Sequence, residues 1–417
     1  MLADLVWSYV NLTWVPELMA AWFRAQPEWF KSGSSATVLL VTVSAIHSRM
    51  RHALVLRRLH TGWCPRTCFT SAMADSLRKR PGFYVERKQD ASAIRQLFSP
   101  DGDVASGFFY FLTGPPGGGK TTLAQRVIHE LREGIIYVAA PSDAGQFGHQ
   151  LANALQLVEQ LPNPLFLVYD YVLNIAGGVE QERSSRLGAC LSALEDAARA
   201  FRAARRRPAV LVIDNAERLA AKEAVMRDVL FAAQQWADRG LVRVVFVSSD
   251  DALITHLLGQ SRCSKAASVE MEDLSEPLAL QYLEKHGVAA KAAAQVVDVT
   301  GGRLLQLMCA VEVLQAGGTS EDVRRLALAA AEAEFQKVGL LDDTPQSAAG
   351  LRVVQALLRN PDGIDSDEWN RLVPSPTDKE ELMQDNVFAR RFRDRRIVFE
   401  NRSVAVYARN KYGGACS

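Results

Sequence analysis

Residues 107–122 read GFFYFLTGPPGGGKTT, and this stretch decides the fold. An apolar run of strand length, Phe108–Leu112, leads into Gly114–Thr121, which matches G-x-x-x-x-G-K-[ST] at every defined position. Helix-forming residues follow, and three of them share one helical face: Leu123, Val127 and Ile128. This succession of strand, glycine-rich loop and helix predicts a phosphate-binding loop.

The residue types in this loop suit a triphosphate. Glycines let backbone N–H groups point inward around the phosphates, and the N-terminus of the next helix adds partial positive charge. Lys120 is placed to reach the β- and γ-phosphates, and the Thr121 hydroxyl can bind Mg²⁺. We therefore expect ATP to be bound by Gly114, Pro115, Pro116, Gly117, Gly118, Gly119, Lys120, Thr121 and Thr122.

A second apolar run, residues 208–214 (PAVLVID), ends in a carboxylate. Continuous apolarity suits a buried parallel strand, and Asp214 would lie at its C-terminal end, where ligands bind in open α/β sheets. We expect Asp214 to hold Mg²⁺ together with Thr121. Asn215 follows, and an amide is a poor general base, so hydrolysis would need another carboxylate. Glu217 is the nearest candidate, and the alternative is a solvated residue in the first turn of a helix.

A third apolar run, residues 241–247 (LVRVVFV), ends in Ser248-Ser249-Asp250. Polar side chains at this strand end would be close to the γ-phosphate or the attacking water, and Ser249 is the candidate for this role. A cap at the start of a helix is an equal alternative, because Ser and Asp are good N-cap residues.

The order of the elements predicts an α/β fold with a parallel sheet in a three-layer core. Strands are expected at residues 108–112, 134–139, 209–213, 242–247 and 267–271, and helices separate them. The pattern becomes helical after about Asp273, and two short strands near residues 387–388 and 397–399 suggest a winged-helix-like end. Asp342–Gly350 (DDTPQSAAG) is polar and predicts a linker. The expected domains are residues 1–80, unassigned; 81–272, the core; 273–340, a helical lid; and 341–417, a winged-helix-like domain.

The positive and negative charges of the chain nearly balance. The 417 residues carry 48 Lys+Arg against 47 Asp+Glu, so the whole chain has no general attraction to nucleic acid or membranes. Five arginines in residues 390–396 are a local exception that could contact nucleic acid or a protein partner, although a solvated hairpin is the commoner outcome. Six scattered cysteines without a secretory signal favour an intracellular, most simply cytoplasmic, location.

The N-terminal segment is partly apolar and then basic. Its longest apolar run, residues 36–46, is far shorter than the roughly 20 residues that span a bilayer. We favour a segment that packs on the main body. Membrane-surface association of residues 1–60, or targeting to an organelle, is the alternative.

Three motifs, GPPGGGKTT, VLVIDNAERL and VRVVFVSSDD, resemble in order and spacing the AAA+/STAND-like branch of P-loop NTPases. Residues 257–288 and 300–307 (TGGRLLQL) are similar to archaeal-type ATPases of that branch, in which this part leads into a helical lid. The resemblance implies an ATP hydrolase that acts through a homo-oligomer or a protein partner and couples its nucleotide state to movement of the lid and the C-terminal domain.

The resemblance also implies roles for single residues. Arg303 would be the lid arginine that senses the γ-phosphate, and Arg262 would be an arginine finger that acts across a subunit boundary. Asn215 departs from the family's catalytic glutamate, which leaves open a non-hydrolysing ATP-gated switch or scaffold as an alternative. The arginines of residues 390–396 leave open a nucleic-acid-handling ATPase as another. The expected catalytic set is Lys120, Asp214, Glu217, Ser249 and Arg303.

Overall fold

The computed structural model describes residues 52–60, 85–98, 107–157, 179–249, 266–342, 345–384, 386–391 and 394–413. By their contacts these residues divide into two compact units. Of the described residues, the first unit holds 52–60, 132–157, 179–211 and 218–243, and the second holds those within 85–131, 212–217 and 244–413.

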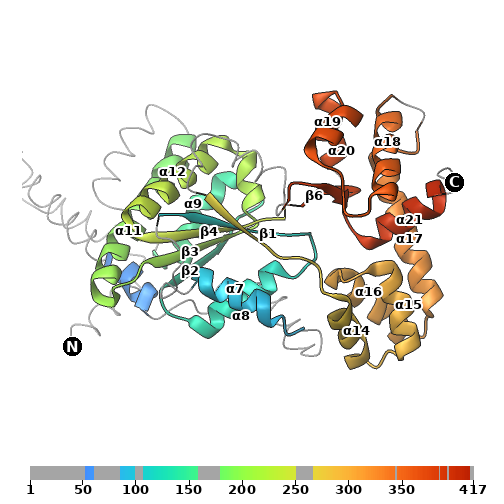
Figure 1. Ribbon diagram of the computed structural model, residues 1–417. Helices are drawn as coiled ribbons and strands as arrows, with labels where there is room; N and C mark the ends of the chain where they lie inside the picture. The colour runs from blue at the N-terminus through green and yellow to red at the C-terminus, as the bar shows by residue number, and fades with distance from the viewer. Residues whose placement is uncertain are drawn as a thin grey trace, which may run out of the picture. The chain divides into compact units, whose positions relative to one another are not determined.

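One five-stranded parallel sheet forms the core, in the order β2-β3-β4-β1-β5 (Figure 1). Strand β1 pairs in parallel with β4 and with β5, with Phe111 opposite Phe246 on one side and opposite Ser268 on the other. All five strands expected from the sequence are present, within one residue at each end. Their bounds are β1, Phe109–Thr113; β2, Ile135–Ala139; β3, Ala209–Asp214; β4, Val242–Val247; and β5, Ala266–Glu270.

Strand β1 is buried along its whole length, as are β3 and β4. Aromatic side chains fill the space around it, and the rings of Phe111 and Phe246 stack with their centroids 5.2 Å apart. Each such buried side chain contributes about 1.5–3 kcal/mol through the hydrophobic effect. This burial fixes the strand that leads into the glycine-rich loop.

The first unit carries helices that accompany β2 and β3. Helix α9 (Phe147–Ala154), which follows the 3₁₀ turn η2 (Ala144–Gln146), packs against α11 (Val179–Arg205). Helix α12 (Glu223–Arg239) ends at Gly240, whose φ of 59° gives the left-handed cap that commonly ends a helix. Residues 52–60 form a further helix.

In the second unit, α7 (Lys88–Phe98) packs against α8 (Lys120–Leu131). Four helices then follow β5 and share one apolar core, which includes Tyr282, Leu307 and Val311. We call these four helices the lid: α14, Glu276–Lys285; α15, Ala290–Thr300; α16, Leu304–Gln315; and α17, Ser320–Lys337.

The C-terminal elements of the second unit have the winged-helix-like arrangement expected from the sequence. Strands β6 (Phe388–Arg390) and β7 (Ile397–Phe399) form an antiparallel hairpin, and Trp369 and Phe388 lie in the core that the helices share. The helices are α18, Pro345–Arg359; α19, Ser366–Leu372; α20, Pro376–Gln384; and α21, Arg402–Tyr412.

The linker predicted at Asp342–Gly350 is wrong, because α18 begins at Pro345. Proline suits the first turn of a helix, where its missing N–H has no intrahelical partner. Gly350 is buried, and a Cβ there would lie 2.2 Å from Cδ2 of Leu340. Gly350 therefore serves close packing rather than a flexible connection.

Several expectations lie outside the described residues. They concern the N-terminal segment up to residue 51, residues 61–84, and Arg262. Among the helices that are described, none has both the length and the apolar character needed to cross a membrane.

Candidate nucleotide site

The glycine-rich loop between β1 and α8 requires glycine at defined positions. Gly114, Gly117 and Gly119 have φ values of 140°, 73° and 91°, which L side chains rarely adopt. At Gly114 the space is also closed, because a Cβ would lie 2.1 Å from the carbonyl oxygen of Met271. The loop backbone at Gly114 thus lies against Met271, the residue that follows β5.

Lys120 opens helix α8 and is 5% exposed. Its Nζ donates to the carbonyl oxygens of Gly114, at 2.7 Å, and Pro115, at 2.9 Å. A buried ammonium group requires such partners. The side chain therefore folds back over the loop, where a phosphate cradled by the same loop would meet it.

Thr121 and Asp214 lie together although 93 residues separate them. The Thr121 hydroxyl donates to Oδ1 of Asp214 at 3.1 Å, and Asp214 is 1% exposed. A hydroxyl and a carboxylate are oxygen ligands of the kind that Mg²⁺ takes alongside substrate phosphates and waters. The donor set therefore fits the magnesium site expected from the sequence.

The backbone turns sharply after Asp214. Asn215 has a φ of 53°, in the left-handed region that Asn tolerates better than most residues, and its N–H donates to Oδ1 of Asp214 at 3.0 Å. The 3₁₀ helix η3 (Ala216–Ala221) begins at the next residue. This turn places Glu217 beside the end of β4, where Ser248 Oγ donates to its Oε2 at 2.8 Å.

Ser248, rather than its neighbour Ser249, makes this contact with Glu217. Ser248 is 2% exposed, whereas Ser249 is half-buried and lines a cavity together with Gly114 and Pro115. Sequence reasoning passed over Ser248, since two adjacent serines at a strand end look alike until the strand's register is known. The role expected for Ser249 stays a prediction.

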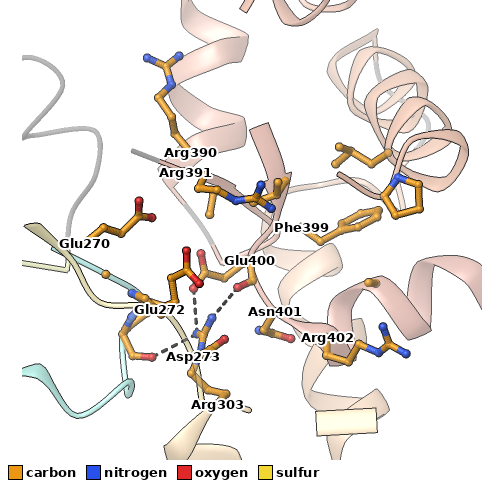
Figure 2. Close-up of a pocket in the computed structure, with 18 of the residues that line it drawn as sticks. Glu270, Glu272, Asp273, Arg303, Arg390, Arg391, Phe399, Glu400, Asn401 and Arg402 are labelled. Atoms are coloured by element: carbon orange, nitrogen blue, oxygen red, sulfur yellow. Dashed lines mark hydrogen bonds and ion pairs between the residues drawn. The ribbon is translucent and has the colours of Figure 1, made fainter. Parts of the chain in front are cut away.

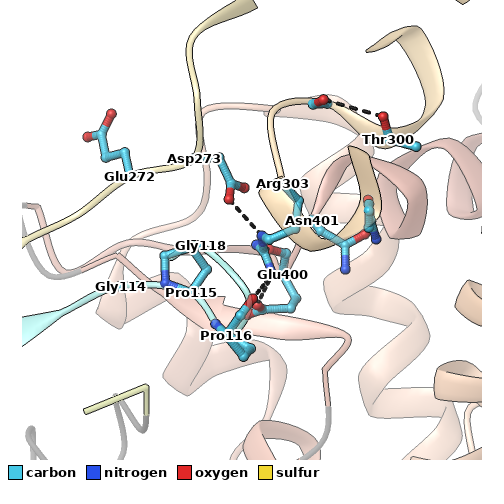
Figure 3. A network of polar contacts seen from close by, with 12 residues as sticks. Gly114, Pro115, Pro116, Gly118, Glu272, Asp273, Thr300, Arg303, Glu400 and Asn401 are labelled. Carbon is cyan, nitrogen blue, oxygen red and sulfur yellow. Dashed lines mark hydrogen bonds and ion pairs between the residues drawn. The ribbon is translucent and has the colours of Figure 1, made fainter. Parts of the chain in front are cut away.

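Arg303 lies at the centre of a polar network (Figure 3). Its Nη1 donates to the carbonyl oxygen of Pro116 at 3.2 Å and to Oε1 of Glu400 at 3.0 Å. Its Nη2 donates to the Glu400 carbonyl oxygen at 2.6 Å, and its Nε donates to Oδ1 of Asp273 at 2.7 Å. One lid residue thus joins the glycine-rich loop, the segment after β5, and the segment between β7 and α21.

The charges in this network are largely buried, since Arg303 is 5% exposed and only 9% of the Glu400 side chain is exposed. Burial disfavours the charge of Arg303, but the carboxylates of Asp273 and Glu400 outweigh it and raise the pKa of Arg303. Burial raises the pKa of Glu400 more than Arg303 lowers it. Arg303 is therefore a permanent cation, whereas burial makes the negative charge of Glu400 energetically costly.

The first turn of α16 lies against the loop as well. The Leu305 N–H donates to the Gly117 carbonyl oxygen at 3.1 Å, and a Cβ at Gly117 would lie 2.7 Å from the Leu305 Cβ. A Cβ at Gly119 would lie 3.2 Å from Cδ2 of Leu304. The first turn of α16 in the lid thus contacts the glycine-rich loop through backbone and side-chain atoms.

Arg87 supports the loop from the segment that precedes α7, and sequence reasoning missed it. The side chain is 7% exposed, and its Nη1 donates to the carbonyl oxygen of Gly118 at 2.8 Å. Its Nη2 donates to the carbonyl oxygen of Glu272, and its Nε pairs with Asp90. An arginine just before a helix is an ordinary surface pattern, so the sequence carried no signal for this contact.

A cavity of about 800 Å³ adjoins the loop in the second unit (Figure 2). Carboxylates from β5 and the segment after it face residues of the hairpin and α21 across this cavity. In the hairpin, Arg391 pairs with Asp394 at 3.2 Å, and Arg396 donates to the Gly363 carbonyl oxygen; Arg393 lies outside the described residues. The charged residues that line the cavity include Glu270, Glu272, Asp273, Arg390, Arg391, Arg402 and Arg409.

Comparison with known proteins finds a family model that matches part of the chain. Residues 106–253 match the family model described as an AAA domain. The fold is similar to the Walker-type ATPase PABY2304 of Pyrococcus abyssi, with a TM-score of 0.51 and 14% identity over 78% of this chain and 96% of that one.

Two further structures are more distant. Cdc6p from Pyrobaculum aerophilum is 16% identical over 79% of this chain and 97% of its own, and the ORC1 protein of Aeropyrum pernix, solved in complex with DNA, is 17% identical over 80% and 94%. Each has a TM-score of 0.38. The search among curated proteins found no match. Residues 106–253, which hold the glycine-rich loop and strands β1 to β4, match the AAA domain model, and the chain has the fold of a Walker-type ATPase.

Proposed function

We propose that this protein binds Mg-ATP at the loop Gly114–Thr122 and couples the state of the nucleotide to its lid and C-terminal elements. Lys120 would contact the β- and γ-phosphates, and the loop N–H groups would surround them. Thr121 and Asp214 would hold Mg²⁺, which supplies positive charge against the phosphates. The match of residues 106–253 to the AAA domain model supports nucleotide binding, and hydrolysis is part of the proposal.

The observation that carries the coupling is the position of Arg303. Its guanidinium reaches Pro116 in the loop while it is also held by Asp273 and Glu400. A γ-phosphate in the loop would compete with these carboxylates for the same N–H donors, because planar cationic donors suit phosphate oxygens. Binding of ATP and release of the Glu400 contact are then linked, and the linkage acts in both directions.

The test of nucleotide binding compares thermal unfolding with and without Mg-ATP. We expect ATP to raise the melting temperature of the wild-type protein and of a Lys291→Ala control, whose side chain is exposed on α15. Lys120→Ala should lose this shift and keep its fold. An equal ATP shift in Lys120→Ala would mean that the nucleotide binds elsewhere.

Single-turnover assays separate the enzyme from a non-hydrolysing ATP-gated switch. Phosphate release from wild-type protein that exceeds release from Lys120→Ala supports an ATPase. ATP binding without phosphate release would support the non-hydrolysing switch. Size measurements with and without ATP would show whether the protein works through a homo-oligomer.

A second candidate function is the handling of nucleic acid, favoured by the arginines of the hairpin and α21 beside the cavity (Figure 2). Arg395 is exposed at the hairpin turn, with a φ of 59°. If the hairpin contacts phosphates, DNA or RNA binding should weaken as salt rises, and Arg393→Ala with Arg395→Ala should reduce both the affinity and the salt dependence. Absent or salt-independent binding would count against this function.

A further inference from the structure

Helix α17 of the lid is apolar on two opposite faces. Its inner face packs against α15, α16 and α21 (Figure 1), and three of its residues are buried there: Val323, Ala331 and Phe335. The opposite face is exposed, yet its centre is apolar as well. Leu326 on that face is 55% exposed, which is unusual for a large apolar side chain in the described part of the chain. Because a helix that is apolar all round is normally covered on both sides, the exposed face is a candidate interface.

Four exposed apolar residues form the centre of this face, which we call the outer face of α17: Leu326, Ala329, Ala330 and Ala333. Successive members are three, one and three residues apart, a spacing that places all four on one side of the helix. The alanines let a second helix approach closely, and Leu326 supplies a larger apolar side chain that such a helix would remove from water. The outer face of α17 therefore fits another helix.

Two opposite charges lie along one flank of the outer face. Arg325 and Glu332 are seven residues apart, which is about two helical turns, and their side chains are 76% and 56% exposed. Arg325 pairs with Asp322 at 2.7 Å. Glu332 accepts from the Tyr407 hydroxyl at 3.1 Å and lies 3.9 Å from the Lys411 ammonium. Ion pairs as exposed as these contribute little to stability, so both charged groups can also pair with a group from outside the helix.

The order of these charges makes the outer face complementary to itself. If two copies of α17 pack antiparallel through their outer faces about a two-fold axis, the charged flank of one helix faces the same flank of the other. The axis then passes midway between Leu326 and Ala333. The position directly opposite Arg325 is two residues from Glu332, an offset of about 3 Å that an arginine side chain spans. Each Arg325 therefore meets the Glu332 of the second copy, whereas in a parallel pair the two flanks would lie on opposite sides of the contact.

We propose that the outer face of α17 is a contact surface for a second copy of this chain, which it meets antiparallel about a two-fold axis. The inference does not depend on nucleotide binding. An 18-residue helix is about 27 Å long, so the interface is small and we expect a Kd in the micromolar range. Because α16 of the same lid contacts the glycine-rich loop, such a dimer links the lids of two subunits.

The experiment measures the dimer Kd of the full chain by sedimentation velocity over a dilution series. Wild-type protein should show a reversible equilibrium between monomer and dimer. Leu326→Lys should raise the Kd at least about tenfold, because it would bury a charge at the centre of the contact. The matched control is Phe231→Lys on α12, which replaces a large apolar side chain that is 63% exposed and should change the Kd by less than about twofold.

Charge reversal tests the antiparallel arrangement. Arg325→Glu and Glu332→Arg should each raise the Kd about 5- to 50-fold, because each change alone places like charges together at both ends of the contact. Arg325→Glu combined with Glu332→Arg restores opposite charges and should return the Kd to within about threefold of wild type. Arg227→Glu, at an exposed position of α12, is the control and should change the Kd by less than about twofold.

Three results would overturn the inference. They are wild-type protein that stays monomeric at every concentration, a dimer that Leu326→Lys does not weaken, and a double charge variant that dimerises no better than the single ones. Misfolding cannot imitate the expected pattern, because the double variant carries both changes and should nevertheless recover the dimer. None of these results bears on ATP binding, which the comparison of wild type with Lys120→Ala tests separately.

Discussion

Nη1 of Arg303 lies 3.0 Å from Oε1 of Glu400, across 97 residues of sequence. The same nitrogen donates to Pro116 in the phosphate-binding loop, and Arg303 Nη2 donates to the Glu400 backbone carbonyl. Glu400 therefore competes with any phosphate that Arg303 would bind. Because a buried carboxylate is costly to keep charged, this contact is poised to be exchanged for a stronger anion.

Replacing Glu400 by Gln should strengthen ATP binding. The change removes the negative charge but keeps a similar shape, so Arg303 loses a competitor for its donors. We expect the Kd for Mg-ATP to fall by about 5- to 100-fold, the usual range of coupling between two sites. Isothermal titration would measure it, with the exposed Glu381→Gln as control. Weaker ATP binding would show that Glu400 instead supports the binding conformation.

Replacing Asp214 by Asn should separate ATP binding from its dependence on Mg²⁺. The amide oxygen can still accept from Thr121 and from the Asn215 N–H, so the fold should survive. The lost charge removes the favoured ligand of a hard cation. We expect stabilisation by ATP in EDTA to match wild type and the additional stabilisation on adding Mg²⁺ to disappear. A normal magnesium effect would exclude Asp214 as a ligand.

Replacing Arg87 by Ala should destabilise the protein and weaken nucleotide binding together. The change removes charged donors from the Gly118 and Glu272 carbonyls, and each such hydrogen bond contributes about 1.5–3 kcal/mol. Denaturant unfolding should show a loss of about 2–4 kcal/mol, and the ATP Kd should rise. Arg95→Ala removes an exposed pair with Glu130 and should cost less than about 1 kcal/mol. Equal effects of the two changes would refute this role for Arg87.

The part of the site that the sequence predicted is the part governed by local chemistry. The loop residues follow from the backbone conformations and charges that a phosphate requires. The meeting of Thr121 with Asp214 follows from parallel strands that end at one edge of the sheet. The strands were predictable because burial on both faces leaves continuous apolar runs.

What the sequence could not predict depends on contacts between distant segments. Arg303 was expected from the family resemblance, yet nothing near Asp273 or Glu400 marked them as its partners. Arg87 and Ser248 were missed because their roles depend on which carbonyl or carboxylate the fold brings beside them. At Gly350 the sequence misled, since a small residue that permits close packing looks the same as one that permits a turn.

Gly114 offers a test of the loop itself by comparison with Gly287, a second glycine of positive φ. Gly114 and Gly287 both have positive φ, but a Cβ at Gly287 meets nothing within 4 Å, whereas at Gly114 it would lie 2.1 Å from the Met271 carbonyl oxygen. Gly287→Ala should cost about 1–2 kcal/mol from backbone strain. Gly114→Ala should cost a further 1–3 kcal/mol from overpacking, because the clash must be relieved by moving the loop or the segment after β5. Urea unfolding and ATP titration would measure both variants. A displaced loop would no longer present its N–H groups to the phosphates, so only Gly114→Ala should lose ATP binding. If Gly114→Ala retains ATP binding, the loop tolerates displacement.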